Sequence, residues 1–500
     1  MTVTYGELRQ QVAEMGEKVS GRFLIFCMCR NEPGAVVGYL GALGNGLVPL
    51  LLDADLQSRQ FARFFEIYQP VYIWASAEWA GEHDPYVQKK MYEAYGYALW
   101  KTGCGSCPLY PELGLLLATS GSTGDPRIVR LSYRNLAVNT ASICEYLHLN
   151  ERERPVTTLP MQYTYGLSVI NSHLLAGACV LLTTASLVQK EFWSFLETEK
   201  ATSFGGVPYT YEILKKIHVF QKTLPSLRTI TQAGGRLPVA LQKEVGLWAR
   251  QQGIAFYVMY GQTEATARMA YLPPEQCLKK LGSIGKAIPG GRFRLLDKSG
   301  AIITEADQIG ELVYEGENVS LGYAQRREDF LLGDVRQGVL FTGDLARRDA
   351  EGYYYIEGRQ KRFVKIFGIR VSLDACEEIL REKYPGLALA CDGRDDCLMV
   401  YVERDSVNRL KESGQITDST PERLENSCEK GRQQNGYGNE NHLEESEFDN
   451  GENDGISVAL TNELAEILQI NRRGFVGVMV EQIPKNASGK ILYGELKRVT

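Results

Sequence analysis

The residues best suited to chemistry form a run of glycines and hydroxyls, Thr119-Ser-Gly-Ser-Thr-Gly-Asp-Pro-Arg127, directly after the apolar residues 114–118. A buried strand that leads into such a loop lets backbone N–H groups approach a ligand closely, because glycine carries no side chain. The hydroxyls add hydrogen-bond donors, and Arg127 adds a fixed positive charge. This composition favours a polyphosphate ligand, although an ordinary turn uses the same residue types.

Three further motifs suit the same nucleotide. Tyr260-Gly-Gln-Thr-Glu-Ala265 follows the apolar residues 255–259 and offers a ring that can stack on a purine, a hydroxyl for a phosphate and a carboxylate for Mg²⁺. Gln232-Ala-Gly-Gly235 offers backbone without side-chain bulk. Phe341-Thr-Gly-Asp344 places a carboxylate after a tight turn, where it can accept hydrogen bonds from a ribose diol. Each of the first two motifs alone is equally compatible with a structural turn, and the third alone is more typical of an Asx-type turn.

Two basic segments lie nearer the C-terminus. The strip Gly358-Arg-Gln-Lys-Arg-Phe-Val-Lys365 is strongly basic, and alone it is typical of a solvated strand. In Ile483-Pro-Lys-Asn-Ala-Ser-Gly-Lys-Ile491 the proline, asparagine and glycine favour a loop that presents Lys485 and Lys490. A lysine on a mobile loop can move to a developing negative charge, whereas alone it is more simply a surface lysine.

Taken in order, residues 119–127, 260–264, 341–344, 358–368 and 484–490 resemble the motifs of the adenylate-forming superfamily. This superfamily includes acyl- and aryl-CoA synthetases, the adenylation domains of peptide synthetases and luciferases, and the sequence most resembles the acyl-CoA or acyl-carrier-protein ligases. The resemblance implies a ligase that uses ATP and Mg²⁺ to convert a carboxylic acid to an acyl-adenylate with release of pyrophosphate. The acyl group would then pass to the phosphopantetheine thiol of CoA or of a separate acyl carrier protein.

The resemblance also implies a role for each matching residue. The loop for the β- and γ-phosphates would comprise Thr119, Ser120, Gly121, Ser122, Thr123 and Gly124. The adenine would lie against Gly234, Gly235, Tyr260 and Gly261, with Gln262 beside them, and the ribose against Asp344 and Arg359. The catalytic residues would be Thr263 at the α-phosphate, Glu264 as the Mg²⁺ ligand, Arg127 in place of the family's loop lysine, and Lys490. Lys361 would be the hinge of the small domain, Gly368 would border the acceptor channel, and Tyr163 and Tyr165 would line the acid pocket.

Three alternatives stay open. An amino-acid-activating enzyme that serves a separate carrier protein is disfavoured, because Phe204-Gly-Gly-Val-Pro208 lacks the aspartate that often binds an amino group in the matching segment of peptide synthetases. A catalytically inactive nucleotide-binding homologue is disfavoured by the intact Glu264, Asp344 and Lys490. A P-loop NTPase would need Gly-x-x-x-x-Gly-Lys-Ser/Thr, which the loop lacks.

The elements that must position these residues alternate between strand-like and amphipathic runs, which predicts an α/β fold. Strands are expected over residues 23–29, 48–52, 71–74, 178–182 and 255–259. We expect an N-terminal adenylation core over residues 1–358, built of layered α/β subdomains with a small β-barrel-like subdomain. A small mobile α+β domain would follow over residues 359–500. Within it, the polar residues 404–455 predict a disordered acidic insertion.

Composition narrows the function classes. The net charge of −6 and the lack of a basic stripe disfavour a nucleic-acid partner. The uncharged residues 34–52 contain many glycines and favour a helix, a turn and a strand over a membrane span. The eleven scattered cysteines and the absence of a secretion signal favour a cytoplasmic protein with reduced thiols, and the five histidines show no zinc-ligand spacing.

Overall fold

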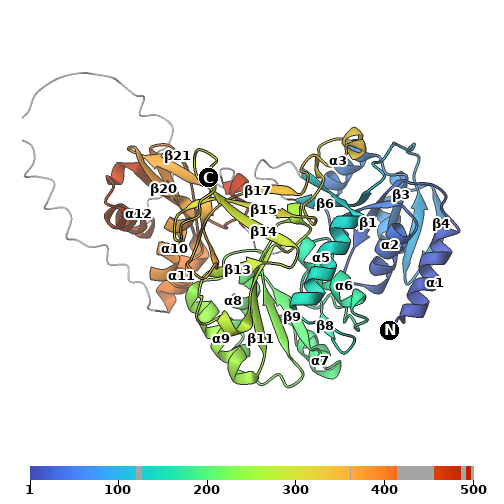
Figure 1. Ribbon diagram of the computed structural model, residues 1–500, viewed down its shortest axis with the longest axis horizontal. Helices are drawn as coiled ribbons and strands as arrows, with labels where there is room; N and C mark the ends of the chain where they lie inside the picture. The colour runs from blue at the N-terminus through green and yellow to red at the C-terminus, as the bar shows by residue number, and fades with distance from the viewer. Residues whose placement is uncertain (120–126, 361, 414–454, 486–490, 497–500) are drawn as a thin grey trace, which may run out of the picture. The chain divides into compact units, whose positions relative to one another are not determined.

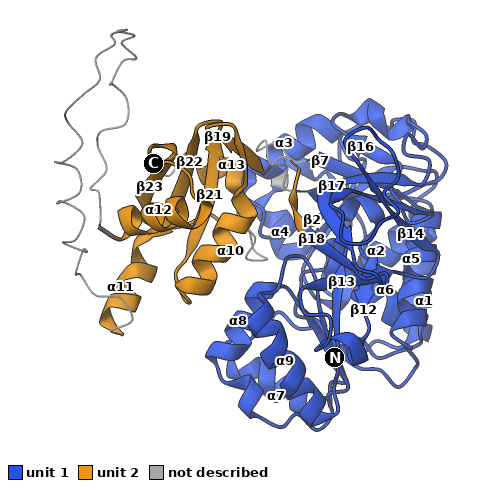
Figure 2. Cartoon of the chain, turned by 60° about the vertical axis from the view of Figure 1, so that its left-hand side comes forward, with its two compact units in different colours: residues 1–121, 125–356 blue, residues 122–124, 357–500 orange. Residues whose placement is uncertain are grey.

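The computed structural model of the chain describes residues 1–119, 127–360, 362–413, 455–485 and 491–496 (Figure 1). These residues form two compact units, of which the first runs to Ile356 and the second begins at Glu357 (Figure 2). The first unit contains two large sheets, and the second contains a hairpin and a three-stranded sheet. The chain therefore has the mixed α/β character that its alternating pattern predicts.

The first sheet has eight strands in the order β16-β7-β6-β2-β1-β3-β5-β4. The central strands β1, β2, β3 and β6 run parallel where they pair with one another. Side chains of β1 alternate between two buried clusters on opposite faces, as expected of a parallel strand that is covered on both sides. The bounds are β1 (Leu24–Cys29), β2 (Val48–Asp53), β3 (Tyr72–Ser76), β4 (Lys89–Ala94), β5 (Tyr97–Lys101), β6 (Leu113–Thr119), β7 (Arg127–Ser132) and β16 (Gly322–Ala324).

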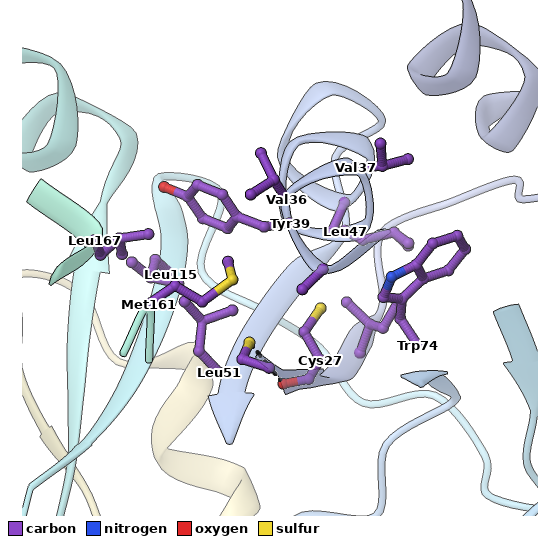
Figure 3. Packing of buried hydrophobic residues seen from close by; sticks show 14 of the residues in the cluster. Cys27, Val36, Val37, Tyr39, Leu47, Leu51, Trp74, Leu115, Met161 and Leu167 are labelled. Atoms are coloured by element: carbon purple, nitrogen blue, oxygen red, sulfur yellow. Dashed lines mark hydrogen bonds between the residues drawn. The ribbon is translucent and has the colours of Figure 1, made fainter. Parts of the chain in front are cut away.

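Helix α2 (Pro33–Gly44) covers one face of this sheet, and its Val36 and Tyr39 pack with Cys27 and Trp74 in one cluster (Figure 3). A Cβ at Gly38 would overlap the Trp74 ring, so glycine permits this close approach of helix to sheet. The expected helix, turn and strand over residues 34–52 are thus confirmed as α2 and β2. The other helices of this region are α1 (Tyr5–Gly16), α3 (Ser58–Tyr68) and α4 (Ala77–Glu82).

The second sheet has ten strands in the order β14-β15-β17-β18-β13-β12-β11-β10-β9-β8. Its parallel part is β8 (Pro155–Val156), β9 (Ser203–Gly206), β10 (Thr229–Gln232) and β11 (Ala255–Tyr260). The remaining strands are β12 (Ala270–Leu272), β13 (Ser283–Ala287), β14 (Gly291–Leu296), β15 (Gly310–Gly316), β17 (Val339–Arg348) and β18 (Tyr354–Arg359). Helices α5 (Tyr133–Tyr146), α6 (Thr164–Leu175), α7 (Lys190–Thr198), α8 (Pro208–Lys216) and α9 (Val239–Gln252) belong to the same unit.

The second unit has its own apolar core, which includes Leu380, Val400 and Leu464. Strand β22 pairs antiparallel with β21 and parallel with β23, while β19 and β20 form a hairpin. Its elements are β19 (Phe363–Ile366), β20 (Ile369–Ser372), α10 (Leu373–Lys383), β21 (Leu389–Arg394), β22 (Cys397–Glu403), α11 (Arg404–Glu412), α12 (Gly455–Leu468), β23 (Phe475–Val480) and α13 (Tyr493–Leu496). In the part of the chain that the structure describes, no helix is both long and apolar enough to cross a membrane.

Two expectations from the sequence are wrong. Residues 178–182 form no strand, because only Leu181 bridges, to Val156, and the chain around it is irregular. The expectation of disorder over residues 404–455 is wrong for its first residues, because residues 404–412 form helix α11. Val407 and Leu410 of this helix lie one turn apart and are buried. Both side chains belong to the apolar core of the second unit. The expectation also fails at its last residue, because Gly455 begins helix α12. Residues 414–454 lie outside the described residues.

Candidate active site

The predicted nucleotide residues of the first unit follow neighbouring strand ends. Strands β9, β10 and β11 are parallel and in register, with Gly206 opposite Gln232 and Gln232 opposite Val258. The loop with Gly234 and Gly235 and the turn after Tyr260 therefore leave the sheet at the same edge. The carboxyl edge of parallel strands is where open α/β sheets bind ligands.

The turn after β11 has an unusual backbone. Thr263 and Glu264 begin a short 3₁₀ helix, and Thr266 and Ala267 both have positive φ angles, of 64° and 145°. Such conformations are costly for residues with a Cβ and persist where surrounding contacts enforce them. A Cβ at Gly261 would overlap the carbonyl oxygen of Ala267, so only glycine fits this position.

Asn318, whose side chain is buried, enforces this turn. Its Nδ2 donates to the carbonyl oxygen of Ala265 at 2.8 Å and to that of Arg268 at 3.1 Å. Its own carbonyl oxygen accepts the hydroxyl of Thr266 at 2.6 Å. The segment that carries Thr263 and Glu264 is thereby fixed to the chain before β16.

Asp344 lies beside Tyr260, as the sequence hypothesis requires. The Tyr260 hydroxyl donates to Asp344 Oδ2, and Gln262 Nε2 donates to the same oxygen at 3.1 Å. Gln262 Nε2 also lies 3.1 Å from the carbonyl oxygen of Thr342. Asp344 is buried, so its carboxylate is held in place by neighbouring donors rather than by water. The motifs at residues 260–264 and 341–344 thus meet.

Glu264 meets the stem of the glycine-rich loop through Tyr323 of β16. The Tyr323 hydroxyl donates to Glu264 Oε1 at 2.6 Å, and the Arg127 guanidinium carbon lies 5.6 Å from the centre of the Tyr323 ring. Arg336 lies over the same ring at 4.9 Å. Burial, followed by the charge of Glu264, raises the pKa of Tyr323 to about 12, so the hydroxyl is a donor at physiological pH.

The stem of that loop is a hairpin of β6 and β7. Thr119 pairs with Arg127, and its hydroxyl donates to the Arg127 carbonyl oxygen at 3.1 Å. Strand β16 pairs with β7 and places Tyr323 opposite Val129. The intervening site residues Ser120, Gly121, Ser122, Thr123 and Gly124 lie outside the described residues.

The two tyrosines of the expected acid pocket lie together. The rings of Tyr163 and Tyr165 are 6.4 Å apart in an edge-to-face arrangement, and the Tyr165 hydroxyl lies 2.7 Å from that of Thr231. Burial raises the pKa of both phenols, that of Tyr165 to about 12. A Cβ at Gly234 would lie 2.6 Å from the Tyr163 hydroxyl oxygen, so Tyr163 adjoins the expected adenine loop.

The second unit carries fewer of the predicted residues. Arg359 is exposed, and its backbone N–H donates to Asp374 Oδ2 at 3.2 Å. Gly368 follows Phe367 at the tip of the β19–β20 hairpin, and both have positive φ, as a two-residue hairpin turn of type I′ requires. Lys361 and Lys490 lie outside the described residues.

Sequence reasoning missed Tyr323 and Arg268. Tyr323 stands in Gly322-Tyr-Ala324, which carries no motif, and only the pairing of β16 with β7 brings it to Glu264. Arg268 lies four residues after Glu264 and stacks over the Tyr165 ring at 4.7 Å. The one signal in the sequence is a lone arginine three residues after the motif Tyr260–Ala265. No group of three or more metal-ligating side chains occurs among the described residues.

Comparison with known proteins places these features in a family. The family model described as AMP-binding enzyme matches residues 1–324. The 3-hydroxybenzoate–CoA ligase of Aromatoleum sp. (strain CIB) is 27% identical over 451 residues, which cover 84% of this chain and 85% of the relative. The indoleacetate–CoA ligase of Aromatoleum aromaticum is 29% identical over 306 residues, 60% of this chain and 59% of the relative. The oxalate–CoA ligase of Arabidopsis thaliana is 32% identical over 270 residues, which cover 53% of this chain and 51% of the relative. The chain thus spans little more than half the length of two of these three relatives.

Solved structures share the fold over nearly the whole chain. The o-succinylbenzoate CoA synthetase MenE from Bacillus subtilis, in complex with the acyl-adenylate intermediate OSB-AMP, has a TM-score of 0.73 at 20% identity and covers 99% of this chain and 93% of its own. ATP-bound MatB from Rhodopseudomonas palustris has a TM-score of 0.70 at 20% identity, with the same coverage. With the family match over residues 1–324, the motifs and their convergence lead to one conclusion: the chain belongs to the AMP-binding enzyme family.

Proposed function

We propose that this chain is an AMP-forming ligase that joins a carboxylic acid to the thiol of CoA. The observation that carries the proposal is the convergence in one unit of three motifs far apart in sequence. Tyr323 joins Glu264 to the stem of the glycine-rich loop at Arg127, and Asp344 accepts the Tyr260 hydroxyl. Such convergence suits a single nucleotide with its phosphates toward Arg127 and its ribose toward Asp344. The names of the relatives, all CoA ligases, support the reaction class.

In the first half-reaction an oxygen of the substrate carboxylate attacks the α-phosphorus of ATP. A new O–P bond forms, the bond to the β-phosphate oxygen breaks, and pyrophosphate leaves with its electron pair. Two anions must meet, so positive groups and N–H donors around the phosphates lower the barrier. Arg127, the loop of residues 119–124, Thr263 and Lys490 would serve this purpose, with Lys490 reaching the acid and the α-phosphate together.

Mg²⁺ fits the donors present. Magnesium is typically held by one or two carboxylates together with substrate phosphates, and Glu264 supplies one carboxylate that Tyr323 already orients. When bound, the ion would neutralise charge on the phosphates. Tyr323 would keep Glu264 aimed at it.

In the second half-reaction the thiol sulfur forms a bond to the acyl carbon of the adenylate and gives up its proton to solvent. The bond from that carbon to the phosphate oxygen breaks, and AMP leaves with the electron pair. Gly368 presents an open site, since a Cβ there would meet nothing within 4 Å, which suits a residue beside the path of an acceptor arm. Rotation of the second unit at Lys361 between the two half-reactions would bring this hairpin to the adenylate. The names of the relatives favour CoA, and the phosphopantetheine of a carrier protein is the competing acceptor.

Acid-dependent exchange of labelled pyrophosphate into ATP tests the proposal. We expect exchange with some members of a panel of organic acids, and AMP rather than ADP as the nucleotide product. Lys490→Ala should reduce exchange by roughly 10²–10³ while sparing thiolysis of a supplied acyl-adenylate. CoA and a phosphopantetheinylated carrier protein are then compared as acceptors. Release of phosphate with ADP, or no exchange with any acid, would contradict the proposal.

A further inference from the structure

Arg268 is a buried charge without a counter-ion among the residues that the structure describes. It is 2% exposed, and no described carboxylate forms an ion pair with it. A buried charge is strongly unfavourable unless it is paired, and so an unpaired one is expected to serve a ligand of opposite charge. The guanidinium of Arg268 has this property, and the reaction as described so far does not use it.

Its neighbours are neutral acceptors. Nε and Nη2 donate to Ser168 Oγ at 3.2 and 3.0 Å, and Nη1 donates to the Tyr146 hydroxyl at 3.0 Å and lies 2.7 Å from Met259 Sδ. A guanidinium carries five N–H donors in a planar fork that matches a carboxylate. Two neutral hydroxyls, one of which is shared by two nitrogens, and a thioether, which is a weak acceptor, contact this fork, so none of its partners carries the negative charge that would balance it.

Arg268 contacts the face of β11 opposite the expected ribose contact at Asp344. Successive side chains of a strand point to opposite faces. Tyr260 points to Asp344, where the ribose is expected, whereas the preceding Met259 points to Arg268. The guanidinium therefore lies on the face of β11 opposite the Tyr260–Asp344 contact, where the ribose is expected.

The same face carries the tyrosines of the expected acid pocket. Tyr165 stacks with Arg268 at 4.7 Å, Tyr163 lies edge-to-face with Tyr165, and Tyr163 adjoins Gly234 of the expected adenine loop. Met259, Tyr146, Tyr165 and Tyr163 belong to one apolar cluster. This row of side chains leads from the nucleotide loop to Arg268, which stands at its buried end.

We propose that Arg268 is a specificity-determining residue that binds a second anionic group of the acid, so that the substrate is a dicarboxylic acid. One carboxylate reacts with ATP, and the other pairs with the Arg268 fork between Tyr165, Tyr146 and Ser168. The inference rests on the proposed function. It adds that the pocket selects acids by charge at the end distant from the reacting carboxyl.

Pyrophosphate exchange with matched acids tests this assignment. Each diacid is compared with its monomethyl ester and with the monoacid of equal chain length, for example glutarate, monomethyl glutarate and pentanoate, across C4 to C6 acids and benzene dicarboxylates. A charged hydrogen-bonded pair corresponds to roughly 10- to 100-fold discrimination. We therefore expect at least one diacid to exceed both of its partners by that factor in kcat/KM.

Three variants separate specificity from folding. Arg268→Gln should reduce the diacid-to-ester ratio at least tenfold, mainly through KM for the diacid. Arg268→Lys, which keeps the charge but loses the fork, should retain part of the ratio. Arg250→Gln changes an exposed arginine of α9 in the same way and should leave the ratio as in the wild type.

The outcomes distinguish the two proposals. If the wild type uses esters and monoacids as well as diacids, the Arg268 assignment is wrong and the ligase activity stands; this result needs no variant, so it holds even if Arg268→Gln does not fold. Equal loss of exchange for diacid and ester in Arg268→Gln would instead assign Arg268 to the reacting carboxylate or to the fold, and would likewise overturn the inference. No exchange with any acid would overturn the ligase proposal itself.

Discussion

The hydrogen bond from Tyr323 to Glu264 gives the sharpest test of the proposed metal site. Tyr323→Phe removes only the hydroxyl that lies 2.6 Å from Glu264 Oε1 and keeps the ring that Arg127 and Arg336 flank. A hydrogen bond to a charged group contributes about 1.5–3 kcal/mol. Glu264 is only half-buried, so water can replace part of the lost hydrogen bond in the variant. We therefore expect a loss at the lower end of this range, about 1.5 kcal/mol.

That energy corresponds to a change of about tenfold in an equilibrium constant. We therefore expect the Mg²⁺ concentration at half-maximal pyrophosphate exchange to rise about tenfold in Tyr323→Phe, within the range typical of residues that orient a metal ligand. At saturating Mg²⁺ the exchange rate should recover most of the wild-type value. The assay is a magnesium titration at fixed ATP and acid.

Tyr92→Phe is the matched control, because the Tyr92 hydroxyl also contacts a glutamate, at 3.1 Å from Glu14 Oε2, with Gln11 Oε1 at 2.6 Å. Its Mg²⁺ titration should superimpose on that of the wild type. The reasoning fails if Tyr323→Phe shifts the titration less than twofold, or if it lowers the rate equally at all Mg²⁺ concentrations.

Three further predictions concern stability. Burial lowers the pKa of His173 to about 4, below the unfolded value of 6.5, so the contribution of the neutral imidazole to folding is intact above pH 6.5 and is lost as the pH falls. Between pH 7 and 5 the free energy of unfolding of the wild type should fall by about 2 kcal/mol more than that of His173→Gln. The measurement is urea unfolding followed by fluorescence of the five tryptophans, which all belong to the first unit. Gly261→Ala, whose Cβ would overlap the Ala267 carbonyl, should lower the same unfolding free energy by about 3 kcal/mol or more, and a smaller loss would mean that the turn can relax. In the second unit, Glu377 is buried against Arg362 at 2.7 Å, so Glu377→Gln should cost about 3 kcal/mol and speed hydrogen exchange in α10 but not in the first unit.

The sequence predicts the motif-bearing elements well where the signal is local. The apolar runs before Tyr260 and before Thr119 are confirmed as β11 and β6, and the helix expected within residues 34–52 is α2. Each is a continuous apolar or amphipathic segment bounded by glycine or proline, which is the strongest pattern that a single sequence offers. The family resemblance is confirmed as well, since the AMP-binding enzyme model matches residues 1–324.

The errors arise where tertiary contacts outweigh local composition. Residues 404–412 read as polar and disordered, yet Val407 and Leu410 lie on one face of α11 and are buried, which docks the helix. Residues 178–182 read as a strand, yet only Leu181 finds a partner, in Val156. The composition of a window cannot reveal which of its few apolar side chains will meet a neighbour.

The functional residues that the sequence did not mark share another property: their neighbours come from distant parts of the chain. Arg268 becomes a candidate binding residue only because it is buried beside Ser168 of α6 and Tyr146 of α5. Tyr323 acquires its role only because β16 crosses to the edge of the first sheet beside β7. A pattern search along the chain sees neither arrangement.

The placement of Tyr323 has its own structural cause, in Arg130 of β7. Arg130 is fully buried, and its guanidinium donates to the carbonyl oxygens of Tyr323 at 3.1 Å and of Leu321 at 3.0 Å, and also to that of Leu332. One buried side chain of β7 thus binds backbone carbonyl oxygens within and beside β16, which fixes β16 against β7. Because β7 also begins with Arg127, a single strand positions both the cation of the glycine-rich loop and, through Arg130, the tyrosine that holds Glu264. The loop stem and the carboxylate proposed to bind Mg²⁺ are therefore coupled through β7, so a change at Arg130 should alter the two together rather than either alone.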